Sequence, residues 1–135
     1  MPQKEFIWPI RVYYEDTDAG GVVFYANYLK FMERARTEWL RSLGYEQDDL
    51  MAKGVIFAVR HVDVDYLRPA RFNDSLNVVS RITRLARASI TFEQTVSKTP
   101  QIITRASIKV ACLDAVSFRP IAIPTDMKED FLSVC

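Results

Sequence analysis

Histidine and cysteine are scarce in this chain of 135 residues, which contains one histidine and two cysteines. So few nitrogen and sulfur ligands do not make up a zinc site of normal spacing, and we expect no metal. Cys112 lies in an alternating apolar stretch and Cys135 ends the sequence, so we expect no disulfide between them. A serine-histidine-aspartate mechanism would have to use His61, and no nucleophilic serine motif accompanies it. We therefore interpret His61 as a structural or surface residue.

The chain also lacks a charge imbalance and long apolar runs. Its net charge of +1 gives no support for binding nucleic acid. No stretch approaches the roughly 20 apolar residues of a membrane helix. The opening MPQKEFIWPI lacks the basic start and apolar core of a signal peptide. We therefore expect a cytoplasmic protein that does not insert into membranes, folded as a single domain over residues 1–135.

Glycine is rare as well, and half of the four glycines lie together at Gly20 and Gly21. They belong to the stretch YYEDTDAGGVVFYANY, residues 13–28, in which Asp16 and Asp18 precede the glycines. A glycine pair indicates a backbone conformation that other residues avoid. Carboxylates on a turn just before a helix, whose first N–H groups are unpaired, make a candidate reaction site. A strand-to-helix turn with solvated aspartates remains the alternative interpretation of these residues alone.

Hydrophobic periodicity predicts one strand, one long helix and then four strands. Apolar residues recur at three- and four-residue spacing over residues 27–43, which predicts an amphipathic helix with Asn27 as N-cap and Gly44 just beyond its end. The charged residues of this helix, Arg36 included, are assigned to its polar surface. Alternation predicts strands over residues 6–15, 55–67, 75–85, 89–97 and 102–113. The remaining predicted segments are a loop or helical turn at 45–54, a short closing segment at 118–123 and a helix from about 125 to 132.

This order of elements predicts an α+β fold in which an antiparallel sheet of about five strands wraps around one long central helix. A single helix cannot protect both edges of such a sheet. We therefore expect two chains to pair, as a homodimer or as a tetramer made of two dimers.

Much of the sequence resembles one family of enzymes. The stretches that carry the resemblance are RVYYEDTDAGGVVFYANYLKFMERARTEWLRSLGY, VRHVDVDYLRPARFNDSL, SRITRLARASITFEQ and FRPIAIP. They are similar to hotdog-fold acyl-CoA thioesterases of the 4-hydroxybenzoyl-CoA thioesterase superfamily, and within it to the bacterial acyl-CoA thioesterases encoded with the Tol–Pal envelope system. The resemblance implies a hotdog fold and hydrolysis of an acyl-CoA thioester to free acid and coenzyme A. It implies no metal and no cofactor besides the coenzyme A of the substrate.

The resemblance also implies roles for residues of the glycine-containing stretch. Asp18 matches the catalytic carboxylate, which acts as a nucleophile or as a general base, and the sequence leaves both open. Asp16 matches the first aspartate of the motif, which supports the turn beside the substrate. The backbone N–H of Tyr25 matches the oxyanion donor, and Gly21 lets the loop approach closely. Near relatives commonly carry histidine where this chain has Tyr25, so a mechanism that needs histidine there does not transfer.

Binding residues are implied outside that stretch. Glu33 matches an acidic residue near the acyl pocket, with a solvated helix charge as the alternative. Arg87, Ser89 and Arg119 match positions that bind coenzyme A, whose phosphates suit guanidinium groups. A second hypothesis is a hotdog module with little or no catalysis that binds acyl carrier protein or lipid-synthesis enzymes. Acyl carrier protein is thus a further candidate partner, and the sequence does not specify the acyl group.

Overall fold

The structure is a computed structural model that describes residues 4–135. Its elements follow one another along the chain as β1 (Phe6–Arg11), the short 3-10 helix η1 (Tyr14–Asp16), α1 (Asn27–Ser42), α2 (Gln47–Ala52), β2 (Val55–Tyr66), β3 (Ser75–Leu85), β4 (Ser89–Lys98), β5 (Gln101–Asp114) and α3 (Thr125–Val134). No helix in this described range is both long and apolar enough to cross a membrane.

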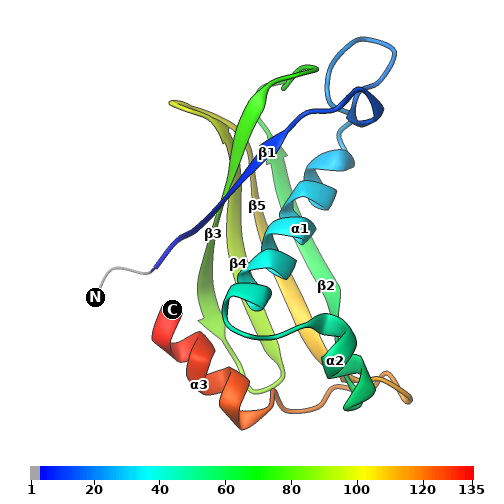
Figure 1. The fold of residues 1–135 in the computed structure, drawn as a ribbon, viewed down its shortest axis with the longest axis vertical. Helices are drawn as coiled ribbons and strands as arrows, with labels where there is room; N and C mark the ends of the chain where they lie inside the picture. The colour runs from blue at the N-terminus through cyan, green and yellow to red at the C-terminus, as the bar shows by residue number, and fades with distance from the viewer. Residues whose placement is uncertain (1–3) are drawn as a thin grey trace.

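The five strands form one antiparallel sheet in the order β1-β3-β4-β5-β2. Alternate residues of the central strands are buried, as the burial pattern of β4 shows over its whole length. The sheet curves around α1, which lies across its concave face (Figure 1). This arrangement confirms the predicted α+β fold with a sheet wrapped around one long helix.

Helix α1 owes its position to a wide apolar face. Its 16 residues make a rod of about 24 Å. Its buried apolar residues are Tyr28, Phe31, Met32, Ala35, Trp39 and Leu40. Trp39 stacks on Phe6 of β1 and meets Phe92 of β4 edge-on. Each fully buried large side chain contributes about 1.5–3 kcal/mol to folding, so this face is sufficient to hold the helix on the sheet.

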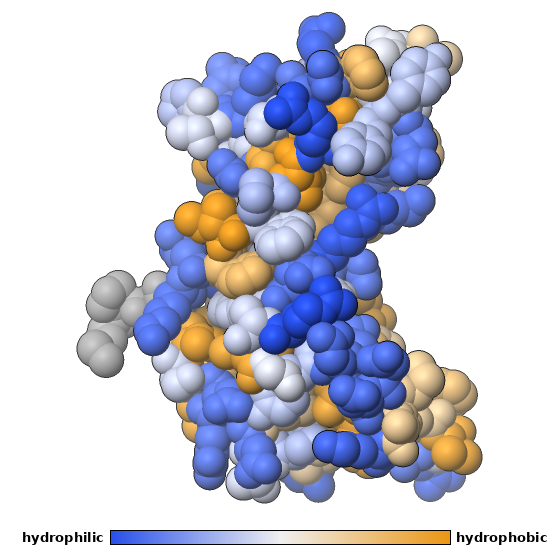
Figure 2. Space-filling view, viewed as in Figure 1, coloured by the Kyte–Doolittle hydropathy of each residue, from blue (hydrophilic) through white to orange (hydrophobic). Residues whose placement is uncertain are grey.

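The helix does not cover the sheet evenly. It packs against β1, β3 and β4, whereas cavities lie between it and β2. β2 is also an edge strand, because within the described residues it pairs only with β5. Figure 2 shows mainly hydrophilic residues along the outward face of α1, with apolar residues visible beside it. The β2 side of the molecule is therefore the open side.

Two predictions at the start of the chain are wrong, and both involve a contact with Asp16. β1 ends at Arg11 and not at residue 15, because the backbone N–H of Tyr13 bonds to the Asp16 carboxylate at 2.8 Å and the chain turns into η1. Asn27 is not an N-cap, since Ala26 holds that position and Asn27 begins the helix itself. The Asn27 side chain instead bonds to Asp16.

The end of the chain follows the prediction with small differences in extent. Residues 118–123 lie beside β5 as a short closing segment, where a single bridge joins Leu113 to Pro120 and the Ile121 N–H bonds to the Cys112 carbonyl. The Asp114 carboxylate accepts two backbone N–H bonds, from Val116 and Ser117, which lower its pKa and fold the chain into a turn. Residues 45–54 contain the helix α2, and α3 continues past residue 132 to Val134. Gly44 follows α1 with a φ of 95°, as predicted.

Candidate active site

A short hairpin before α1, residues 16–25, carries the residues predicted to react, and we call it the site hairpin. Thr17 and Val23 form an isolated antiparallel bridge. On either side of it, the Asp18 N–H bonds to the Val22 carbonyl at 2.9 Å and the Phe24 N–H to the Asp16 carbonyl at 2.9 Å. In Figure 1 this segment lies at the N-terminal end of α1. Backbone bonds therefore fix the hairpin without help from a ligand.

The connection between β2 and β3 holds the site hairpin in place. The Val23 N–H bonds to the Ala70 carbonyl at 2.8 Å, and Val22 forms a bridge with Arg71. The Ala70 N–H in turn donates to the Tyr28 hydroxyl at 3.0 Å. Burial raises the pKa of Tyr28, so this phenol stays neutral. The hairpin, the connection and α1 are thus linked by hydrogen bonds.

Asp16 lies inside this assembly. Its side chain is 4% exposed. One carboxylate oxygen accepts the Tyr13 N–H and the other accepts the Asn27 side-chain amide, both at 2.8 Å. Both oxygens are therefore engaged within the chain, which suits support of the turn better than contact with substrate.

Asp18 has the opposite environment. It is exposed, and one carboxylate oxygen accepts the Gly20 N–H at 2.8 Å. Its second oxygen has no hydrogen-bond partner among residues 4–135. A Cβ on Gly20 would lie 3.2 Å from the bonded Asp18 oxygen, so a larger residue there would make that carboxylate shift slightly. At Gly21 no atom lies within 4 Å of such a Cβ, and its φ of 80° is what requires glycine. Close approach of the loop to a substrate at Gly21 stays a prediction.

Tyr25 presents its backbone N–H at the base of the hairpin. This N–H donates to no acceptor in the described part of the chain. The Tyr25 side chain is 62% exposed and joins a group of aromatic rings with Phe24, Tyr28 and Tyr66. A cavity of about 250 Å³ is lined by Tyr25, Tyr28 and Tyr66 together with the start of the β2–β3 connection. An unpaired donor therefore borders an aromatic cavity.

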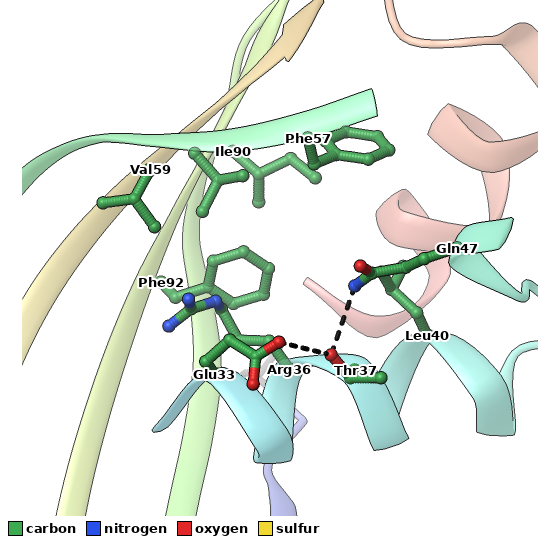
Figure 3. Close-up of a pocket in the computed structure, with 10 residues that line it drawn as sticks. Glu33, Arg36, Thr37, Leu40, Gln47, Phe57, Val59, Ile90 and Phe92 are labelled. Carbon is green, nitrogen blue, oxygen red and sulfur yellow. Dashed lines mark hydrogen bonds between the residues drawn. The ribbon is translucent and has the colours of Figure 1, made fainter. Parts of the chain in front are cut away.

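Two further cavities continue along the open side of α1. The first, about 390 Å³, is lined by Leu29, Lys30, Glu33, Arg36, Val59, Val62 and Ile108. The second, about 110 Å³, is lined by Glu33, Arg36, Thr37, Leu40, Gln47, Phe57, Val59, Ile90, Phe92 and Val110 (Figure 3). Glu33, Arg36 and Val59 belong to both, so the two cavities are neighbours. Their walls are mostly apolar, which suits an acyl group.

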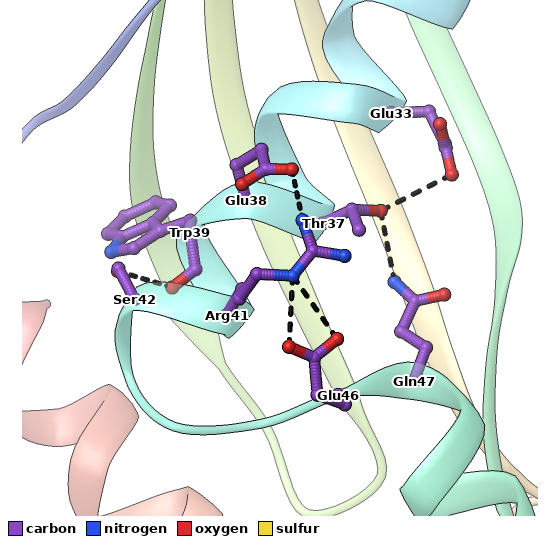
Figure 4. Close-up of polar contacts among 8 residues, drawn as sticks. All are labelled: Glu33, Thr37, Glu38, Trp39, Arg41, Ser42, Glu46 and Gln47. Carbon is purple, nitrogen blue, oxygen red and sulfur yellow. Dashed lines mark hydrogen bonds and ion pairs between the residues drawn. The ribbon is translucent and has the colours of Figure 1, made fainter.

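Glu33 is held at the rim of these cavities by α2. Thr37 donates to the Glu33 carboxylate at 3.3 Å, and the Gln47 side-chain amide donates to the Thr37 hydroxyl at 3.2 Å (Figure 4). Arg41 fastens the two helices nearby, since it contacts Glu38 and forms a 3.0 Å ion pair with Glu46. The sequence placed Glu33 near the acyl pocket without indicating these supporting residues.

Arg36 was assigned to the polar surface of the helix, and that assignment is wrong. Its side chain is buried, with 9% exposure, and donates to the Gln94 side-chain oxygen at 2.9 Å. The Gln94 amide nitrogen bonds to the Met32 carbonyl and to the Ser80 hydroxyl. A signal was present in the sequence, because Arg36 lies four residues after Met32 and four before Leu40, within the apolar stripe.

The residues proposed for coenzyme A lie far from the site hairpin of the same chain. The hairpin follows Arg11, which pairs with Ser75 at one end of β3, whereas Arg87 and Ser89 follow Leu85 at the other end. The 11 residues of β3 make these ends about 33 Å apart. Arg119 lies at the Arg87 end, because β5 and the segment after it bond to residues 87 and 88 there. One chain therefore does not bring these residues to Asp18.

The remaining candidate ligands stay apart. His61 is exposed and lies opposite Lys109 of β5. Cys112 is buried and Cys135 is exposed, and both are free thiols. No group of three histidine, cysteine or acidic side chains within residues 4–135 is arranged to hold a metal ion.

Comparison with known proteins agrees with this fold. The sequence model of the family described as thioesterase superfamily matches residues 20–103. The acyl-CoA thioesterase YbgC of Haemophilus influenzae is 42% identical over 132 residues, which cover 97% of each chain. The acyl-CoA thioester hydrolase YbgC of Escherichia coli O6:H1 is 43% identical over 127 residues, 93% of this chain and 95% of the relative. A solved structure of a probable thioesterase from Bartonella henselae superposes with a TM-score of 0.84 at 34% identity, covering 89% of this chain and 99% of the other.

These matches confirm the family resemblance seen in the sequence. The chain belongs to the thioesterase superfamily.

Proposed function

We propose that this protein hydrolyses an acyl-CoA thioester to a free acid and coenzyme A, with Asp18 as the reacting carboxylate. The observation that carries the proposal is that the site hairpin presents both a carboxylate and an unpaired backbone N–H. Asp18 offers an exposed carboxylate with an unbonded oxygen, and Tyr25 offers an unpaired backbone N–H just before α1. The similarity to acyl-CoA thioesterases over almost the whole chain supports the same reaction.

Two routes use these groups. In one, the Asp18 carboxylate attacks the thioester carbonyl carbon, the carbon–sulfur bond breaks, and water then hydrolyses the acyl-aspartyl anhydride. In the other, Asp18 removes a proton from a water molecule whose oxygen attacks the same carbon. In both, coenzyme A leaves as a thiolate and takes up a proton from water. The Tyr25 N–H would bond to the negative carbonyl oxygen, a contact whose loss typically costs about 3–4 kcal/mol.

The complete site is proposed to require two chains. Because Arg87, Ser89 and Arg119 lie at the far end of the sheet from Asp18, their contacts with coenzyme A would serve the site hairpin of another chain. The unpaired edge of β2 provides a surface for such pairing. A homodimer, or a tetramer of two dimers, would then bring a carboxylate of one chain to the arginines of its partner.

The reaction is tested by measuring free thiol released from a panel of acyl-CoA and acyl carrier protein thioesters. Asp18→Asn should lower kcat about 10²–10⁴-fold, as expected for loss of a reacting carboxylate. Asp49→Asn is the matched control, because Asp49 is an exposed aspartate on α2, outside the site hairpin and outside β2, and it should keep wild-type activity. Full activity of Asp18→Asn would refute the assignment of Asp18. Stable binding of acyl carrier protein without turnover of any thioester would favour a binding module instead.

A further inference from the structure

Arg36 stands out as a buried cation without an ion pair, although Glu33 on the rim of the same cavities acts on it electrostatically from a longer distance. It is 9% exposed, yet no carboxylate in the described residues lies within 4.0 Å of its guanidinium. A guanidinium has five N–H donors, and the one bond recorded for Arg36 goes from Nη1 to Gln94. A buried charge normally requires an opposite charge or full hydrogen bonding. Among residues 4–135, Arg36 has no ion pair and only one recorded hydrogen bond.

The unpaired nitrogens of Arg36 are accessible. Among residues 4–135, Thr104 Oγ1 is the one fully buried side-chain nitrogen or oxygen without a hydrogen-bond partner. Nε and Nη2 of Arg36, for which no bond is recorded, are therefore not completely buried. Arg36 lines both cavities beside α1, and in Figure 3 its side chain extends beside the Phe92 ring. The donors that the protein leaves unused thus border the proposed acyl site.

Gln94 fixes the position of the guanidinium. The two bonds from the Gln94 amide nitrogen, to the Met32 carbonyl at 3.0 Å and to the Ser80 hydroxyl at 2.9 Å, direct its oxygen toward Arg36. All these contacts are buried. The guanidinium is therefore held in place before a ligand arrives, which reduces the entropy lost on binding.

The charges around the larger cavity favour an anion. Its lining includes two cations, Lys30 and Arg36, and one carboxylate, Glu33. Lys30 and Glu33 are exposed, so solvent screens them, whereas Arg36 is buried. The other lining residues are Leu29, Val59, Val62 and Ile108. A short run of methylene groups ending in a carboxylate would match both the apolar walls and the cation.

We propose that the larger cavity binds the distal carboxylate of an ω-carboxyacyl group, and that Arg36 is the specificity-determining residue that pairs with it. The substrate class is then the coenzyme A thioester of a short dicarboxylic acid. This inference rests on the proposed thioesterase function and assigns a substrate class to it. Lys30 assists by adding positive charge at the rim, and Glu33 opposes the same ligand.

The test compares acyl groups that differ only at the distal end. Adipoyl-CoA and hexanoyl-CoA both have six acyl carbons, and we expect wild-type kcat/KM to favour adipoyl-CoA at least tenfold. Binding of two non-hydrolysable thioethers, S-(5-carboxypentyl)-CoA and S-hexyl-CoA, is measured by calorimetry alongside. The binding measurement does not depend on turnover. It therefore separates a failure of the inference from a failure of the proposed function.

Variants assign the preference to the cavity. Arg36→Met should abolish it and Arg36→Lys should retain part of it. If Arg36→Met does not fold, variants at two exposed positions keep the test decisive. Lys30→Met should lower the preference for adipoyl-CoA about threefold, and Glu33→Gln should raise it about threefold. Arg34→Met is the matched control, since Arg34 is an exposed cation of α1 that lines neither cavity, and it should change nothing.

Equal or better hydrolysis of hexanoyl-CoA, together with equal binding of the two thioethers, would overturn the inference. A preference that Lys30→Met and Glu33→Gln leave unchanged would overturn it as well. Tighter binding of the carboxylated thioether without hydrolysis of any thioester would support the cavity assignment and refute the proposed function.

Discussion

The bond between the Asn27 amide and the buried Asp16 carboxylate lends itself to a quantitative test. Asn27→Ala removes the amide and leaves Asp16 Oδ1 without a partner at a site that is 4% exposed. The position left by the amide is too deeply buried for water to hydrate the carboxylate fully. The substitution should therefore destabilise the fold and loosen the site hairpin.

The size of the effect follows from two opposing contributions. A hydrogen bond to a charged group is worth about 1.5–3 kcal/mol. Alanine is a better helix former than asparagine by up to about 0.7 kcal/mol, which offsets part of the loss. The free energy of unfolding should fall by about 1–2.5 kcal/mol. For a chain of this length, at about 4 °C per kcal/mol, Tm should fall by about 4–10 °C.

Urea unfolding of wild type and variant measures this change directly. Thr17→Val is the matched control, because the Thr17 hydroxyl donates to the Tyr14 carbonyl at 2.7 Å in an exposed position of the same hairpin. That control should cost no more than about 0.5 kcal/mol. A double-mutant cycle with Asp16→Ala should give a coupling energy of at least about 1 kcal/mol. A loss below about 0.5 kcal/mol for Asn27→Ala, no larger than that of the control, would refute the reasoning.

Two further substitutions probe the backbone and the pH dependence. Gly21→Ala places a Cβ at a φ of 80°, which should lower the free energy of unfolding by about 1–2 kcal/mol and also lower kcat. Gly44→Ala, at a φ of 95°, should lower the free energy of unfolding by about the same amount without affecting kcat. Denaturant unfolding measures the stability of each variant, and steady-state kinetics measures its kcat. The bond from Tyr45 to Asp130 at 2.5 Å raises the pKa of Tyr45 to about 12. Because the folded state then holds this proton more tightly, the stabilisation is complete below pH 10 and is lost between about pH 10 and 12. Tyr45→Phe should remove that slope, worth less than about 1 kcal/mol after solvent screening, and an unchanged slope in pH-dependent unfolding would contradict it.

Periodicity was sufficient for the regular elements because each buries one face. The helix at residues 27–42 and the strands from residue 55 onward fall within a few residues of their predicted ranges. Where a hydrogen bond from a polar side chain determines the backbone conformation, the hydrophobic periodicity was misleading. Residues 13–15 continue the alternation of a strand, yet the Asp16 carboxylate captures the Tyr13 N–H and ends it. Residues 118–123 follow the turn capped by Asp114 and return along β5, where the Ile121 N–H bonds to the Cys112 carbonyl and Pro120 forms a single bridge with Leu113.

The residues of the candidate site also fall into those that a local pattern indicated and those that it did not. The motif indicated Asp18 and Tyr25 because their chemistry depends on a local turn before a helix. The roles of Arg36 and Gln94 depend on a contact between residues 58 positions apart, which no local pattern reports. Arg36 lay on the apolar face by spacing, and its charge alone led to its assignment to the surface. The separation of Asp18 from Arg87 likewise becomes visible only once the strand register is known.

The contacts that hold the site hairpin also determine when it can become ordered. Its anchors come from the β2–β3 connection, and the same connection bonds to the start of the chain through Arg11 and Asn73, which are 62 positions apart. Contacts across such separations must close long loops, which makes them slow to form. During synthesis the site hairpin emerges early but lacks these anchors until the β2–β3 connection follows. The carboxylate and the amide thus gain their final positions only after more than half of the chain has been made.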